Sequence, residues 1–190
     1  MLKIYVTRSS SWTSRLIRYF LRSSFASHVA GAFAILRNFR AVLEASERGT
    51  TLGSERSFLE KNEVVAEFVL VTGPLSHAEG FRKALGEFLA KHLGDEYDYL
   101  SGGAIGFRER LRFLWRWSLV RDWFAAKFGA GKVHCSELWV RFLLPLGYLQ
   151  TLASTPPDLV GPVELTRALL ADGRNFRLER ISDGYRKELF

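Results

Sequence analysis

The sequence predicts an α+β fold in which helices pack on an antiparallel β-sheet, and three patterns in the 190-residue chain support this prediction. Segments typical of strands, the first of them alternating apolar and polar residues, recur between residues 2 and 72. Two of these segments are joined by a short basic link, as in an antiparallel hairpin. Apolar residues at helical spacing follow at 81–93 and again at 135–143.

Length and composition favour one domain over residues 1–190, because a chain of this size can bury a sizeable core. A formal charge of +7 favours approach to an anionic membrane surface, nucleic acid or another acidic polymer. No nucleic-acid-binding motif accompanies the arginines, so we expect no specific nucleic-acid partner. The single cysteine excludes an internal disulfide, and no secretory signal or membrane-spanning run is present, so we expect a cytoplasmic protein.

The first quarter of the chain predicts three strands and one helix. Leu2 to Thr7 alternates as a strand, and the serines at 9–11 can cap a helix whose face carries Trp12, Leu16, Tyr19 and Phe20. Residues 29–36 are small or β-branched and form a second strand, with His28 at its start. After the basic link 37–40, residues 41–46 form the third strand, which places the carboxylate of Glu44 within an apolar segment.

The middle of the chain predicts a loop, a strand and a well-marked helix. Residues 47–63 are polar and predict a loop with one short strand near 50–53, and 64–72 is a further strand. Ser76 with Glu79 three residues later forms a capping-box pattern, and the apolar face that follows ends at Gly94. Residues 95–100 then lead into a glycine-rich turn at 101–106.

Arginines and tryptophans are interleaved over residues 108–128, in the sequence RERLRFLWRWSLVRDWFAAKF. One interpretation is a helix with a buried apolar face and a basic outer face. The other is a surface helix or lid that touches lipid or an acidic partner, because tryptophans beside arginines suit an interface.

The remaining segment predicts a helix that begins near the only cysteine of the chain. From Cys135, apolar residues recur at i+3, i+4, i+7 and i+8, and Pro145 with Gly147 ends the pattern. Residues 155–159 predict an extended loop, 163–170 a short helix and 175–181 a last strand. At a helix N-terminus the free N–H groups and the helix dipole favour a thiolate over a thiol, whose pKa is otherwise about 8.5.

Cys135, His28 and Glu44 supply the three parts of an activated-thiol site. The histidine would take the thiol proton, and the carboxylate would orient the imidazole and stabilise its charged form. Glu44 needs a donor because an unpaired carboxylate in an apolar strand costs several kcal/mol, and His28 can be that donor. The competing interpretations are a buried structural cysteine and a structural histidine.

The strand register decides whether His28 and Glu44 can meet. They face each other if the hairpin loop centres near Leu36, but a turn centred on residues 38–39 displaces Glu44 by about five residues, or roughly 17 Å. A bulge or an asymmetric loop would restore the pairing. Glu47 and Asp98 are the alternative orienting acids.

The other histidines fit the site less well. His134 is the weaker base candidate because neighbours along a chain seldom converge on one reacting atom, and His77 and His92 are expected on the surface of a helix. A zinc site is set aside because the paired ligand spacing is missing, so we expect neither a metal nor a cofactor.

These motifs resemble the circularly permuted papain-like hydrolases of the NlpC/P60 superfamily, the branch with the YiiX-like and YaeF-like proteins. The resemblance spans about residues 3–150 and lies in SHVA at His28, VLEA at Glu44, YDYL at 97–100 and HCSELW at Cys135, with the histidine before the cysteine. It implies a permuted papain-like fold with Cys135 as nucleophile, His28 as base and Glu44 as orienting residue.

The same resemblance implies that the strand containing Tyr97 and Tyr99 lies beside the site. Either these are core tyrosines, or a hydroxyl or backbone N–H there helps to bind a developing oxyanion together with the N–H of Cys135. The favoured hypothesis is a thiol hydrolase of the amidase or peptidase kind, acting on a small-molecule, peptide or lipid-linked amide or ester. The alternatives are a lipid-acting acyltransferase of the same fold and a catalytically silent binding module, phage- or envelope-associated.

Overall fold

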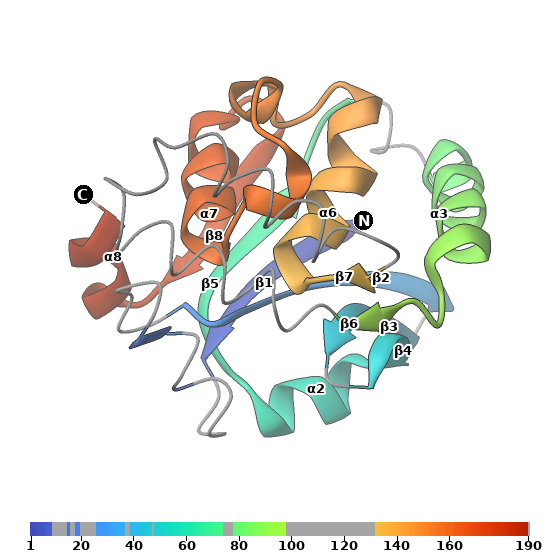
Figure 1. Ribbon diagram of the computed structural model, residues 1–190, viewed down its shortest axis with the longest axis horizontal. Coiled ribbons are helices and arrows are strands. Elements are labelled where there is room, and N and C mark those ends of the chain that lie inside the picture. The colour runs from blue at the N-terminus through green and yellow to red at the C-terminus, as the bar shows by residue number, and fades with distance from the viewer. Residues whose placement is uncertain are drawn as a thin grey trace, which may run out of the picture.

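The computed structural model describes residues 1–8, 15, 18, 19, 26–36, 39–46, 48–73, 78–97 and 132–189. Six strands form one antiparallel sheet in the order β4-β3-β2-β1-β5-β8 (Figure 1). Their bounds are β1 Leu2–Arg8, β2 His28–Leu36, β3 Phe39–Ser46, β4 Gly49–Ser54, β5 Glu63–Leu70 and β8 Phe176–Ile181. A separate parallel pair consists of β6 Glu96–Tyr97 and β7 Lys132–Val133. The predicted α+β class with an antiparallel sheet is therefore confirmed.

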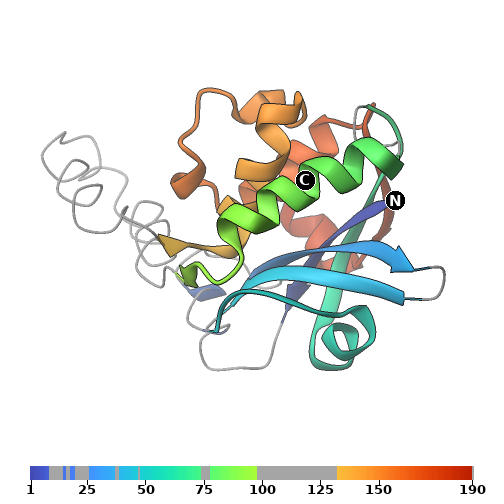
Figure 2. The same cartoon turned by 90° about the vertical axis from the view of Figure 1, so that its right-hand side faces the viewer.

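Helices cover both faces of the sheet, and Figure 2 shows α3, α6 and α7 on one side of it and α2 on the other. The helices are α2 Glu55–Lys61, α3 Ala78–His92, α6 Cys135–Leu143, α7 Pro162–Ala171 and α8 Asp183–Leu189. Three single turns of 3₁₀ helix, η2 Leu144–Leu146, η3 Gln150–Leu152 and η4 Pro157–Leu159, follow α6. No helix in the described part of the chain is long and apolar enough to cross a membrane.

Two apolar clusters result from the alternation of side chains along the strands. The larger cluster joins the sheet to α6 and α7, and includes Ile4, Val29, Leu43, Trp139 and Leu165. The smaller cluster lies where α2 covers the sheet, and consists of Tyr5, Ala30, Ala32, Val42 and Phe58. Both clusters include residues of β2 and β3, so these strands are packed tightly from either side.

Helix α6 is seated on β2 through one close approach. Trp139 is fully buried, and an ideal Cβ built on Gly31 would lie 2.1 Å from the Cη2 atom of its indole. Only a glycine leaves room for the ring at this point. The contact fixes the height of α6 above the strand that begins at His28.

Two loop predictions are wrong. Residues 55–61 form α2, whose N-cap Ser54 accepts a hydrogen bond from the Ser57 N–H and whose only buried side chain is Phe58. Residues 157–159 form a 3₁₀ turn within the expected extended loop. The predicted last strand is β8, and α8 follows it. The predicted helix at 12–20, the cap at Ser76, the turn at 101–106 and the segment 108–128 lie largely or wholly outside the described residues.

Candidate active site

Cys135 is the first residue of α6, as the apolar spacing predicted, and its side chain is buried, with 3% of the residue exposed. The strand β7 leads directly into the helix, and Val133 pairs with Tyr97 of β6. The first N–H groups of a helix have no partner within the helix itself. The backbone N–H groups of Cys135 and Ser136 are therefore the donors that α6 does not use internally.

His28 and Glu44 are in contact, with 2.8 Å between Nε2 of the imidazole and Oε2 of the carboxylate. Ala30 is the residue opposite Glu44 in the β2–β3 ladder. His28 precedes Ala30 by two positions, so it shares the face of Glu44 at one diagonal step, a distance that long side chains can span.

Neither register considered from the sequence is therefore correct. Residue pairs from Ala30 and Glu44 to Ala34 and Arg40 centre the hairpin on residue 37, and the pairing shifts before Leu36 and Phe39. Glu44 lies two residues from the level of His28 rather than opposite it or five residues away. The irregular pairing occurs at the tip of the hairpin, where a sequence pattern gives the least information.

The contact with Glu44 determines how the imidazole of His28 can act. With Nε2 directed at the carboxylate, Nδ1 is the nitrogen left for the thiol. The ring of Phe58 lies 6.3 Å from the imidazole, centre to centre, and backs it with an apolar surface. His28 and Glu44 keep 15% and 28% of their side chains exposed, so solvent reaches the pair.

The electrostatics favour a thiolate and imidazolium pair. Burial acts to raise the pKa of the Cys135 thiol, but the positive charge of the nearby His28 outweighs it, so the pKa lies well below its usual value. Burial likewise acts to lower the pKa of His28, but the charge of the Cys135 thiolate and the contact with Glu44 raise it well above its usual value. Each group thus stabilises the charged form of the other.

His134 is the N-cap of α6, and its ring is committed to that role. Nδ1 accepts a hydrogen bond from the Glu137 N–H at 3.3 Å, and Nε2 donates to the carbonyl of Asp158 at 3.2 Å. The Glu137 carboxylate accepts from the His134 N–H in return, which completes a capping box. Burial acts to lower the pKa of His134, but its interactions with Cys135 and Glu137 outweigh burial and raise the pKa. Protonation of Nδ1 would nevertheless break the cap.

The sequence patterns did not predict a buried polar network around this cap. The Ser136 hydroxyl donates to the Val160 carbonyl at 2.6 Å, and Arg141 pairs with the carboxylate of Glu137, which is 1% exposed. Burial raises the pKa of Glu137 despite the nearby positive groups. The signal was present as a histidine three residues before a glutamate, but histidine is an uncommon N-cap.

We predict that replacing His134 with Asn will leave the reactivity of Cys135 largely intact, because Asn is a good N-cap and His28 stays in place. His134→Ala will lose about 1 kcal/mol of unfolding free energy with the cap. Urea denaturation and the pH profile of iodoacetamide alkylation measure the two effects. A loss of thiolate reactivity in His134→Asn as large as in His28→Ala would identify His134 as the base instead.

The remaining candidates divide between the described and undescribed residues. Tyr97 belongs to β6, the neighbour of the strand that leads to Cys135, whereas Tyr99, Asp98, Glu47 and His77 lie outside the described residues. The expectation that His92 is a surface residue is wrong. It is 7% exposed, its Nδ1 lies 2.7 Å from the Asp95 carboxylate, and its ring packs on Phe88.

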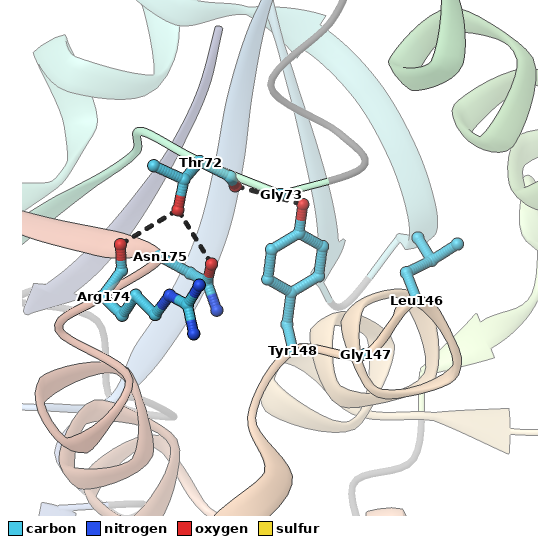
Figure 3. A pocket seen from close by; sticks show the side chains of 7 residues that line it. All are labelled: Thr72, Gly73, Leu146, Gly147, Tyr148, Arg174 and Asn175. Carbon is cyan, nitrogen blue, oxygen red and sulfur yellow. Dashed lines mark hydrogen bonds between the residues drawn. The ribbon is translucent and has the colours of Figure 1, made fainter.

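A surface pocket lies apart from these residues and shares none of them. Thr72, Gly73, Leu146, Gly147, Tyr148, Arg174 and Asn175 line it (Figure 3). No family model matches this chain, and a search of curated proteins finds no match.

Proposed function

We propose that this protein is a cysteine hydrolase that cleaves an amide or ester bond through a thioester on Cys135, on a permuted papain-like fold. The observation that carries the proposal is Cys135 at the start of α6 together with the 2.8 Å contact between His28 and Glu44, and the charge of His28 lowers the pKa of the Cys135 thiol. A buried cysteine with only a structural role needs no charged partner. Here the imidazolium of His28 outweighs the effect of burial on the pKa of the thiol, which suits the activation of a nucleophile.

Acylation would begin with attack of the Cys135 thiolate on the substrate carbonyl carbon. A C–S bond forms, and the carbonyl π electrons move to the oxygen, within reach of the N–H groups of Cys135 and Ser136. When the tetrahedral intermediate collapses, the C–N or C–O bond breaks and the His28 imidazolium gives its proton to the leaving group. The product of this half-reaction is the acyl thioester.

Deacylation would reverse the proton transfer with water as the nucleophile. His28 takes a proton from the water as its oxygen attacks the thioester carbon, and the C–S bond breaks to release the acid and restore the thiolate. The carboxylate of Glu44 stabilises the imidazolium in both half-reactions. The partial exposure of His28 and Glu44 allows this water to reach the imidazole.

Trapping the thioester tests the proposal without knowledge of the natural substrate. The protein is mixed with activated acyl esters such as p-nitrophenyl acetate, and then with peptide amides and lipid amides, and its intact mass is followed during turnover. We expect an acyl adduct on Cys135 that forms rapidly and then hydrolyses, and no adduct in Cys135→Ala. An adduct that never hydrolyses, or its formation at the same rate in His28→Ala, contradicts the proposal.

A further inference from the structure

Among the described residues, five large apolar side chains are exposed at one end of the sheet, away from Cys135. They are Met1 (61%), Ile35 (50%), Leu36 (68%), Phe39 (43%) and Val71 (37%). Scattered exposed apolar residues are ordinary, but a group of them on adjacent strands marks an interaction surface. We call these five residues the apolar end.

The strand register shows that these residues are neighbours. Leu2 pairs with Phe33 of β2, and Lys3 pairs with Val69 of β5. Met1, which precedes Leu2, therefore lies between the ends of β2 and β5. Leu36 pairs directly with Phe39 across the tip of the β2–β3 hairpin. Figure 2 shows the N-terminus on the same side of the molecule as the end of β2 and the start of β3.

The pocket of Figure 3 adjoins the apolar end, because Thr72 and Gly73 directly follow Val71 and the Val71 N–H donates to the Asn175 carbonyl at 2.8 Å. The polar groups of its wall are mostly engaged. The Tyr148 hydroxyl donates to the Thr72 carbonyl, and the Asn175 amide donates to Asp172.

Arg174 differs from its neighbours in the pocket wall. Its side chain is exposed, and it forms no ion pair with any residue that the structure describes. The nearby Asp172 carboxylate already accepts hydrogen bonds from the Leu149 N–H and the Asn175 amide. A guanidinium at the wall of a pocket offers two parallel donors to a phosphate or carboxylate.

We propose that this face docks on a lipid bilayer that contains anionic phospholipid. The apolar end inserts into the interfacial region of the bilayer, and Arg174 binds a headgroup phosphate at the border of the apolar end. Three features agree: exposed apolar side chains at a hairpin tip, a guanidinium beside them that no described residue pairs with, and a net charge of +7 on the chain. The phosphate is that of a lipid rather than a free anion because the apolar end needs a nonpolar medium to cover it.

The docking surface is independent of the proposed hydrolase. Strand β2 has nine residues from His28 to Leu36, which separates the two ends by about 26 Å at the rise of a strand. Docking through the apolar end therefore leaves the surroundings of Cys135 uncovered. Variants of either region should affect only their own property.

Vesicle sedimentation tests the surface in the full chain. Binding is measured to phosphatidylcholine vesicles with and without about 30% phosphatidylglycerol, at about 0.1 M and about 0.5 M NaCl. The variants are Leu36→Asp with Phe39→Asp, Arg174→Gln, and Leu59→Asp as a control, because Leu59 on α2 is 42% exposed outside this surface. Thermal melting and the alkylation rate of Cys135 verify that each variant keeps its fold.

We expect binding to the anionic vesicles that weakens in salt, falls about tenfold or more in the double variant and severalfold in Arg174→Gln, and is unchanged in Leu59→Asp. Inorganic phosphate should not displace the protein. Failure of the wild type to bind, or unchanged binding in both surface variants, overturns the proposal. Self-association that the double variant abolishes, without vesicle binding, would assign the apolar end to a second copy of the chain and also overturn it.

Discussion

Replacing His28 with alanine will remove the thiolate of Cys135 at neutral pH. In the wild type the imidazolium lowers the pKa of a thiol that burial alone would raise. Without it the pKa returns to about 8.5 or higher, so only about 3% of the sulfur is ionised near pH 7. The loss of thiolate alone would lower the alkylation rate at this pH by about 30-fold. The observed decrease will be smaller, because a more basic thiolate is intrinsically more nucleophilic.

The midpoint of the pH dependence distinguishes the pair from an isolated cysteine. Wild-type reactivity should already be high below pH 8 and decline only as acid protonates the thiolate at its lowered pKa. In His28→Ala the whole profile moves to higher pH. Iodoacetamide alkylation followed by mass spectrometry gives both curves, and coincident curves would show that the two residues do not form a pair.

Glu44→Gln provides a graded version of the same experiment. Its amide keeps the size of the side chain but loses the charge that helps to raise the pKa of His28. The midpoint of alkylation should lie between those of the wild type and His28→Ala, and ester hydrolysis should fall by about 100-fold or more. Glu67→Gln is the matched control, because Glu67 is a half-buried carboxylate of the same sheet that pairs with Lys3 instead.

The parts of this site that could be predicted from sequence are those set by local patterns. Cys135 lies at the start of a helix because the apolar residues after it keep one face, and His28 lies at the start of a strand because small residues follow it. The same patterns gave β1, β3, β5, α3 and α7 to within a few residues.

What could not be predicted depends on contacts that no local pattern encodes. The diagonal step between His28 and Glu44 depends on an irregular hairpin tip, and the role of His134 depends on the carbonyl of Asp158, 24 residues away. Helix α2 buries only Phe58, so it has no apolar stripe to detect. The helical pattern does not predict the burial of His92, because its partner Asp95 lies beyond the end of its own helix.

The second large effect concerns the packing of α6 on β2. Gly31→Ala will destabilise the protein by about 2–3 kcal/mol, because the new methyl group would lie 2.1 Å from the Trp139 ring in a packed core. For a chain of this length this loss lowers the melting temperature by about 5–10 °C. Gly53→Ala is the control, since no atom lies within 4 Å of its Cβ position and its strand β4 is at the edge of the sheet.

A double-mutant cycle with Trp139→Leu separates this clash from a general intolerance of alanine in β2. Leucine lacks the distal indole ring that meets Gly31, so the single variant loses about 2–4 kcal/mol through the cavity it leaves. On that background Gly31→Ala should cost almost nothing, which gives a coupling energy of about 2 kcal/mol. Additive losses would show that the glycine serves the strand rather than the helix. Coupling would show that the distance between Cys135 and His28 rests on a residue that carries no functional group, and the alkylation rate of folded Gly31→Ala should then fall as α6 is displaced.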